Sequence, residues 1–466
     1  MVEIKSKYDV IVIGSGTAGC YFAHSLAEQG YKVCVIDSTS KDKLGSKLYL
    51  FHTDTERFSS YNVPEPQPGD PDYIGMFEYG IIKSAFDKYP KKAEYPFTVA
   101  LLPPFLKRLR LWAESVGVEF YYDTKFIDFT YNEANKINGA QIECNGETLN
   151  ISARLVADCS GIISIARRKL KEGTVETFEI GPRDQFYVTL RYVKLKDPEK
   201  DKVTLSTGWA YYKSWIAPAP EPDGAIIGIG ANLSSEYAEQ CFQRFEKVIP
   251  LPEHTVERIE KGSTPYHRPP YSLVTDGFVC LGDSACMTKP FSGEGITAGW
   301  VGCKIAADIV GLVMKDGAYP TADKLWGINV KYNTTQGADF AYIMATLVNA
   351  IECTPEENDY EFKKNIVFSA KALTEMNRKF NADMPLGDIL KLVFGVLGGV
   401  FSGNISLKTV KKLLRGISYA GKLKKHYKKF PKSQSGYVAW KKKADQLWAD
   451  TGEMADVVER MESKRK

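Results

Sequence analysis

The start of the chain carries the pattern that most constrains its fold. A continuous apolar strand at residues 8–13 runs directly into a glycine-rich turn at 14–19. The residues that follow have the spacing of an amphipathic helix, 18–29, and of a second apolar strand, 32–36. A strand, a glycine turn, a helix and a strand within about 30 residues predict a parallel βαβ unit that binds a dinucleotide.

The residues of the turn, GSGTAG, have separate roles. Gly14 allows the tight turn, Gly16 lets the backbone approach a diphosphate, and Gly19 lets the helix pack on the strand. Thr17 and Ala18 begin the helix, whose N–H groups and partial positive charge favour a phosphate. The turn alone does not distinguish FAD from NAD.

Two aspartates follow strands and are candidates for binding sugar hydroxyls. Asp37 ends the second strand and is placed to accept hydrogen bonds from a ribose. Asp283 follows a short buried strand at 279–281 and is placed to hold the ribityl chain of a flavin. The helix that begins at Ile296 can face the flavin pyrimidine edge, where negative charge collects on reduction. This second glycine loop therefore favours FAD, and its candidate contacts are Gly282, Asp283, Pro290, Gly293, Gly295 and Ile296.

A third stretch, DCSGIISIAR, lies between these two motifs. It is expected to form a strand end, a turn and a short basic helix. Its candidate cofactor residues are Asp158, Gly161 and Arg167.

The three stretches, in this order and at these separations, resemble the flavoprotein superfamily of para-hydroxybenzoate hydroxylase. Within that superfamily, GDSACMTKPFSGEGI is similar to the geranylgeranyl reductase branch. The resemblance implies FAD, a cofactor contact at the Lys47 loop, and a Trp-x-x-Pro strand over the flavin, which Trp215 to Pro218 matches loosely. A cysteine often found in the family's Lys47 loop is absent here, and Leu102 stands where an arginine is frequent.

The expected fold class is α/β. A doubly wound, Rossmann-like FAD-binding domain receives an inserted antiparallel β-sheet substrate domain and is followed by an α-helical C-terminal region. Residues 38–95 are expected to be irregular, and 239–260 to be helical. The predicted boundaries are 1–60, 96–172 and 272–320 for the FAD-binding domain, 61–95 and 173–271 for the substrate domain, and 321–466 for the helical domain.

Few residues are suited to proton transfer. Among five histidines, His52 follows the Lys47 loop, where the family's chain passes near the isoalloxazine, and it titrates near neutrality. A histidine that is merely packed in the core is an equally good interpretation. Tyr212, near Trp215, is a weaker candidate.

Other site types are not supported. The nine cysteines form no CxxC pair, so neither a zinc site nor an iron–sulfur cluster is expected, and a reducing, cytoplasmic compartment is inferred. A net charge of +4 gives no argument for nucleic acid. The longest apolar run, 392–401, is half of the roughly 20 residues that a membrane-spanning helix needs.

The C-terminal third is strongly basic. Residues 401–445 contain thirteen Lys or Arg and one acidic residue, Asp445. Together with the apolar run, residues 390–445 resemble a segment that contacts the cytoplasmic membrane face, or a docking face for an acidic redox partner. A packed helical domain with a solvated lysine face is the plain alternative.

Three functions fit these features. The first is reduction of carbon–carbon double bonds in an apolar isoprenoid or quinone-like substrate, with electrons from a ferredoxin-like protein or NAD(P)H. The second is a flavin monooxygenase or halogenase. Halogenases of the superfamily have Trp-x-Trp-x-Ile-Pro, and Lys213 replaces the first Trp here. The third is an electron-transfer flavoprotein dehydrogenase.

Overall fold

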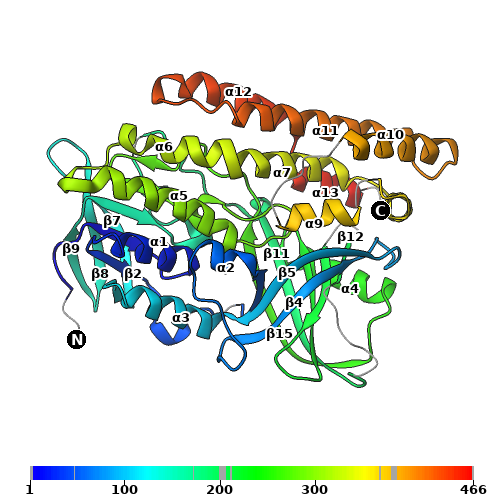
Figure 1. The fold of residues 1–466 in the computed structure, drawn as a ribbon, viewed down its shortest axis with the longest axis horizontal. Coiled ribbons are helices and arrows are strands. Elements are labelled where there is room, and N and C mark those ends of the chain that lie inside the picture. The colour runs from blue at the N-terminus through cyan, green and yellow to red at the C-terminus, as the bar shows by residue number, and fades with distance from the viewer. Residues whose placement is uncertain are drawn as a thin grey trace.

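The computed structural model describes residues 4–46, 48–171, 173–198, 206–209, 213–366, 369–378 and 386–463. Figure 1 shows two layers of sheet and helix, with a row of C-terminal helices along one side. The predicted α/β class, with a parallel core, an antiparallel sheet and a helical C-terminal region, is confirmed.

A six-stranded sheet forms the core of the first layer. Strand β16 is antiparallel to β17, and the other strands are parallel. Strands β1 and β2 are buried along their whole length, because a parallel sheet is covered on both faces. In spatial order the strands are β16 (Val274–Thr275), β17 (Phe278–Cys280), β10 (Leu155–Asp158), β1 (Val10–Ile13), β2 (Val33–Ile36) and β6 (Glu119–Tyr121).

Helices and a small sheet cover this core. Helix α1 (Thr17–Ala27) packs against α3 (Leu102–Glu114) and α5 (Ile296–Met314). The three-stranded sheet of β7 (Thr124–Tyr131), β8 (Ile137–Cys144) and β9 (Glu147–Ser152) contacts β10. Among the described residues, one helix, Ile296–Gly317, has the length and hydropathy of a membrane span, but 61% of that window is buried inside the protein.

An eight-stranded, mostly antiparallel sheet forms the second layer. Its edge strand β3, which the predicted boundaries assign to the FAD-binding domain, pairs with β5 in this sheet. In spatial order the strands are β15 (His254–Pro265), β11 (Gln185–Leu195), β14 (Gly224–Ala231), β13 (Lys213–Pro218), β12 (Ser206–Trp209), β4 (Tyr73–Ile82), β5 (Lys91–Leu101) and β3 (Leu50–Asp54).

Two local expectations were wrong. Residues 38–95 are not wholly irregular, because β3, α2 (Glu56–Ser60), β4 and the start of β5 lie there. The predicted helix at 239–260 is a helix only as far as α4 (Ser235–Val248). Pro250 and Pro252 then stop it, and β15 follows.

The described part of the chain after residue 320 contains helices and no strands. Helix α11 packs on α7, and α10, α11 and α12 lie along the upper edge of Figure 1. These helices are α6 (Ala322–Tyr332), α7 (Ala338–Ala350), α8 (Pro355–Lys364), α9 (Ala370–Arg378), α10 (Leu386–Phe401), α11 (Leu407–Tyr427), α12 (Tyr437–Thr451) and α13 (Met454–Ser463).

Candidate functional site

A cavity of about 420 Å³ lies between the two large sheets. Its polar end is formed by the loops that leave the carboxyl ends of β1, β10 and β17, which is where open α/β sheets bind ligands. The predicted cofactor residues that line it are Gly16, Thr17, Ala18, Gly161, Gly282, Asp283, Gly293, Gly295 and Ile296. Three motifs that are far apart in the sequence therefore meet at one cavity.

The glycines divide into two groups by what a side chain would meet. A Cβ on Gly14 would lie 2.4 Å from the carbonyl oxygen of Cys159, and one on Gly19 would lie 1.9 Å from that of Gly14. A Cβ on Gly16 or Gly161 would meet nothing within 4 Å. The first pair allows close packing of the backbone, and the second pair leaves open space in the cavity, as a bound diphosphate requires.

Two helices point their N-termini at this cavity. Thr17 begins α1, which has no side-chain capping hydrogen bond, and Ile296 begins α5, where the Glu294 carboxylate accepts from the N–H of Thr297. Each terminus presents a partial positive charge. A long ligand with a diphosphate at one end and a ring that gains negative charge at the other matches both. The residues present therefore fit FAD.

Asp283 lies in the cavity wall. Its Oδ1 accepts a hydrogen bond of 3.0 Å from Thr288 Oγ1. Burial is the largest influence on this carboxyl group and raises its pKa. Hydroxyl groups of a bound ribityl chain would supply the hydrogen bonds that the buried carboxylate needs.

Other predicted cofactor residues organise the loops instead of lining the cavity. Asp37 accepts hydrogen bonds from the Ser15 N–H at 2.8 Å and from Ser15 Oγ at 2.7 Å, so it fixes the glycine turn. Asp158 is buried and accepts from the N–H groups of Ser160 and Arg167. Burial is the largest influence on Asp158 and raises its pKa.

Arg167, in the DCSGIISIAR stretch, is fully buried and connects that stretch to the turn at 282–285. Its guanidinium donates to the carbonyl oxygens of Ser284, at 2.8 Å, and Glu176, at 2.7 Å. These contacts hold the 282–285 turn in place beside the cavity.

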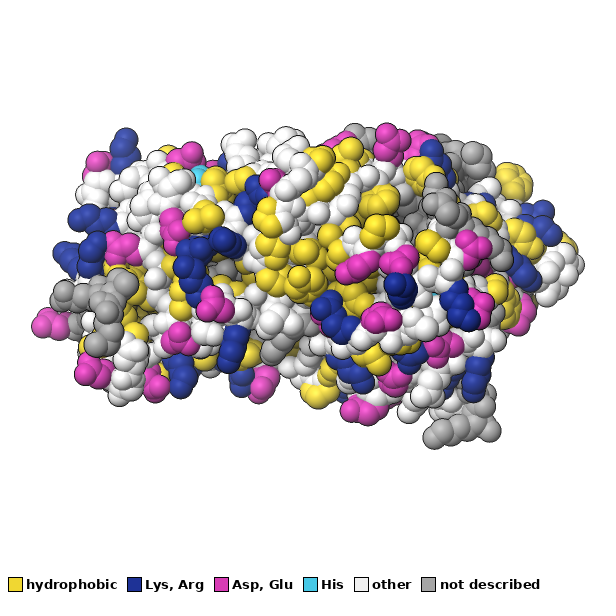
Figure 2. Space-filling model, turned by 90° about the horizontal axis from the view of Figure 1, so that it is seen from below, with side chains coloured by type: hydrophobic (Ala, Val, Ile, Leu, Met, Phe, Trp, Pro, Cys, Tyr) yellow, Lys and Arg dark blue, Asp and Glu magenta, His cyan; other side chains and the backbone are white. Residues whose placement is uncertain are grey.

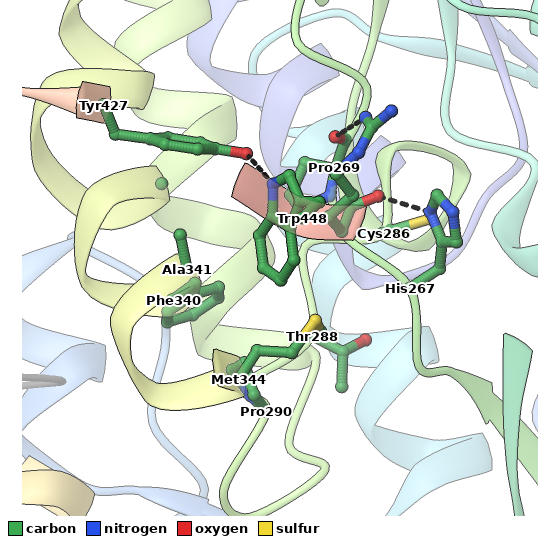
Figure 3. Close-up of a pocket in the computed structure, with 12 residues that line it drawn as sticks. His267, Pro269, Cys286, Thr288, Pro290, Phe340, Ala341, Met344, Tyr427 and Trp448 are labelled. Atoms are coloured by element: carbon green, nitrogen blue, oxygen red, sulfur yellow. Dashed lines mark hydrogen bonds between the residues drawn. The ribbon is translucent and has the colours of Figure 1, made fainter. Parts of the chain in front are cut away.

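Pro290 faces away from the cofactor cavity. It lines a water-sized space between the 286–290 segment and helices α7, α11 and α12. Figure 3 shows Cys286 beside His267 and Pro290 beside Met344, and Trp448 donates a hydrogen bond of 3.0 Å to the Tyr427 hydroxyl. Burial raises the pKa of the Cys286 thiol to about 12, so the thiolate is not formed at neutral pH. The helical layer therefore supports the cofactor loop from behind.

The apolar wall of the cavity comes from the eight-stranded sheet. The indole of Trp215 lies flat over Gly228, its partner on β14, where a Cβ would be 2.1 Å from the ring. The Phe186 ring lies next to Gly230, where a Cβ would be 2.2 Å from Cε1 of the ring. The wall also includes Leu48, Leu50, Val188, Leu190, Ala217 and Ile226. Leu102, where the family often has an arginine, lines the cavity as well.

His52 and Lys213 are the basic side chains of this cavity. His52, on β3, contacts it, and burial, followed by the positive charge of Lys213, lowers the pKa of the ring to about 4. Burial lowers the pKa of Lys213 to about 7, and its ammonium donates to the carbonyl oxygen of Ser292. The sequence analysis noted Lys213 only because it stands where halogenases have the first Trp of their Trp-x-Trp-x-Ile-Pro motif. Its position at an inward-facing site of an apolar strand is the signal that would have identified it.

A buried ion pair holds the loop before α5. The Lys289 ammonium lies 3.3 Å from a Glu294 carboxylate oxygen, with both side chains less than 10% exposed. Glu294 also accepts from the N–H of Thr297 at 2.8 Å. Sequence reasoning did not select this pair.

Lys47 and Tyr212, which the sequence analysis selected, lie outside the described residues. Among the described residues no group of His, Cys, Asp and Glu is arranged to hold a metal.

Comparisons with known proteins also indicate an FAD-binding protein. Residues 9–47 match the family model described as an FAD binding domain. A digeranylgeranylglycerophospholipid reductase of Sulfolobus acidocaldarius is 21% identical over 95% of this chain and 97% of its own. The Haloferax volcanii protein of that name is 24% identical over 62% of this chain and 72% of its own.

Solved structures share the fold. A geranylgeranyl bacteriochlorophyll reductase-like protein of Thermoplasma acidophilum has a TM-score of 0.63 and 15% identity, with 90% of this chain and 99% of that chain covered. The flavin-dependent brominase Bmp2 has a TM-score of 0.62 and 16% identity, with 84% and 93% covered. With three motifs converging on one cavity, the chain is an FAD-dependent oxidoreductase that is similar, over nearly its whole length, to reductases of geranylgeranyl lipids.

Proposed function

We propose that the protein reduces carbon–carbon double bonds of a polyprenyl lipid. The observation that carries the proposal is the apolar wall around Trp215, which continues directly from the cofactor motifs within one cavity. The names of the full-length relatives, reductases of digeranylgeranylglycerophospholipid, support this substrate class. Bound FAD, once reduced, supplies a hydride from its N5 atom.

The chain itself positions the alkene and excludes water. The aromatic rings of Trp215 and Phe186, next to Gly228 and Gly230, give an apolar surface on which an extended isoprenoid can lie. The ion pair of Lys289 and Glu294 fixes the loop at the N-terminus of α5, where negative charge is favoured. Electrons reach the site from an external donor, which we propose to be a ferredoxin-like protein or NAD(P)H.

The test uses reduced, FAD-loaded protein without oxygen. Addition of a polyprenyl lipid with intact double bonds should reoxidise the flavin rapidly and give a product heavier by two hydrogens per bond, measured by mass spectrometry. The fully saturated lipid is the matched control and should leave the flavin reduced. If the flavin stayed reduced with both lipids, the proposal would be rejected.

The same preparation tests the monooxygenase or halogenase alternative, which the fold similarity to brominase Bmp2 favours. Rapid reaction with air and an observable flavin hydroperoxide would support that alternative. If only a protein acceptor reoxidised the flavin, an electron-transfer dehydrogenase would be supported.

We also propose that the protein works in the cytoplasm, on the membrane face, through α10 and α11. Phe394 and Phe401 on α10 are 70% and 90% exposed. No aspartate or glutamate occurs between Asp388 and Asp445, and Lys411, Lys422 and Lys425 are exposed on α11. Protruding aromatic rings beside lysines favour an anionic lipid surface over a protein partner.

A further inference from the structure

Lys213 occupies a chemically unusual position. It is the first residue of β13, and its side chain lies on the same sheet face as Trp215 and Ala217. Across β14 and β11, the residues of this face that line the cavity are apolar. Lys213 is the one Lys or Arg among the cavity-lining residues that the structure describes.

The ammonium of Lys213 has a hydrogen bond but no ion pair. It donates to the backbone carbonyl of Ser292, in the loop that precedes α5. Within the described residues, no carboxylate lies within 4.0 Å of its nitrogen, whereas nearby Lys289 pairs with Glu294 at 3.3 Å. A lysine that only stabilised the fold would be expected to have such a counter-ion. A lysine that exchanges protons with a ligand would not need one.

We propose that Lys213 is the proton-exchanging group of the cavity and, under the proposed function, the acid that completes alkene reduction. One carbon of the double bond receives the hydride, with its electron pair, from reduced FAD. The other carbon forms its new C–H bond with a proton from the Lys213 ammonium, and the N–H electrons stay on nitrogen. The neutral amine then regains a proton from solvent between turnovers.

The surrounding charges support this assignment. Burial, followed by the positive charge of Lys289, brings the pKa of Lys213 to about 7, where a general acid is most effective. The other titratable groups that line the cavity are His52, Tyr95, Cys159, Asp283 and Glu294. Burial raises the pKa of the Tyr95 hydroxyl and of the Cys159 thiol, which makes both of them weak acids. His52, with a pKa of about 4, is neutral at pH 7, and the one N–H that a neutral ring keeps is a far weaker acid than the Lys213 ammonium.

Two substitutions separate charge from proton transfer. Lys213→Arg keeps a cation that cannot release its proton at working pH, and Lys213→Met removes both charge and proton. His52→Gln is the control for the competing acid. All three proteins are first loaded with FAD, and their thermal unfolding is compared with that of the wild type.

In single turnovers with the polyprenyl lipid, both Lys213 variants should be slower by about 100-fold or more, and His52→Gln, at a residue that lines the same cavity, should be slowed far less. The wild-type rate should fall above about pH 7. Both variants should lack that fall. A Lys213→Arg protein as fast as the wild type would overturn the proposal, because charge alone would then suffice.

A measurement without turnover keeps the proposal separate from the proposed function. The flavin midpoint potential of the wild type should change its pH dependence near pH 7, and Lys213→Arg should remove that change. If the lipid is not reduced but the change is present and depends on Lys213, the proposed function fails and proton exchange stands. A pH dependence that is the same in wild type and Lys213→Arg overturns proton exchange.

Discussion

A methyl group on Gly16 and one on Gly228 would meet different surroundings. Gly16 has an ordinary φ of −71°, and its Cβ would project into open space. Gly228 has the Trp215 indole at 2.1 Å from that position. Gly16 is expected to leave room for the ligand, and Gly228 leaves room for the indole. A substitution at Gly16 should therefore weaken ligand binding, whereas one at Gly228 should lower the stability of the fold.

We expect Gly16→Val to weaken FAD binding by about 100-fold or more, equivalent to about 2.7 kcal/mol, because the side chain occupies the space of the diphosphate. The apoprotein should unfold at the wild-type temperature. Flavin fluorescence titration and calorimetry measure the two quantities. Wild-type affinity for FAD would show that the diphosphate lies elsewhere.

We expect Gly228→Ala to lower the free energy of unfolding by about 1–3 kcal/mol, because the indole must leave its place. Urea denaturation measures this change. Gly421→Ala, on an α11 site with nothing within 4 Å, is the matched control and should not destabilise the protein. Equal stability of the two variants would contradict the packing of Trp215 on β14.

His52 predicts a pH-dependent stability. Its pKa is about 4 in the folded protein against an ordinary 6.5, so folding favours the neutral ring. The stabilisation is full above pH 6.5 and is lost as the pH falls towards 4, and it amounts to at most about 3 kcal/mol. His52→Gln should therefore lose less stability than the wild type between pH 7 and pH 4.5 in urea denaturation. If wild type and His52→Gln lost equal stability over this pH range, His52 would lie in a solvated site.

At the scale of elements, the sequence predicted those whose pattern is local. The buried strands β1 and β2 and the helices α1 and α5 carry continuous apolar runs or glycine turns. Strand β15 was missed because it is an edge strand whose middle residues are mostly exposed, so its charged residues show no alternation. Strands β4 and β5 have mixed burial, and the pairing of β4 with β12 joins residues far apart in the sequence, which no local pattern reveals.

The same limit applies to the site. Gly16, Asp283 and Ile296 could be placed at the cavity because turn chemistry is local. Lys213 could not be assigned a role, because its environment is created by β14, β11 and the loop at Ser292, which come from other parts of the sequence.

The proposed membrane surface on helices α10 and α11 can be tested. Replacing Lys411, Lys422 and Lys425 with Gln should weaken binding to phosphatidylserine vesicles by about 100-fold, at roughly 1 kcal/mol per lysine, and replacing Phe394 and Phe401 with Ser should also reduce sedimentation with the vesicles. Unchanged binding in both variants would indicate a packed helical domain with a solvated lysine face.

The control for that experiment lies on the other side of the molecule. Figure 2, seen from below, shows hydrophobic side chains gathered in the middle of that face, whereas α10 to α12 lie along the upper edge of Figure 1. Met76 on β4 and Leu111 on α3 are half exposed. Met76→Ser with Leu111→Ser should leave vesicle binding unchanged. Loss of binding in this pair alone would assign the membrane face to the lower side.

At the scale of the whole molecule, loops from the start, middle and later part of the chain meet at the cavity that fits FAD. A ligand that binds only the folded state adds about 4 kcal/mol of stability at a thousandfold excess over its Kd. We expect the unfolding temperature to rise clearly on addition of FAD. The Asp283→Ala variant should need about tenfold more FAD for the same rise. Differential scanning calorimetry measures this. An identical FAD dependence in the variant would remove Asp283 from the ribityl site.

The pairing of β4 with β12 has a consequence for how the protein is made. Ile81 and Ile82 on β4 pair with Ser206 and Thr207, which the ribosome adds much later. Until then, the β4–β5 hairpin leaves the exit tunnel with one edge of unsatisfied amide groups, a template for pairing with a neighbouring nascent chain. We therefore expect a chaperone that shields this edge during translation to raise the yield of folded protein.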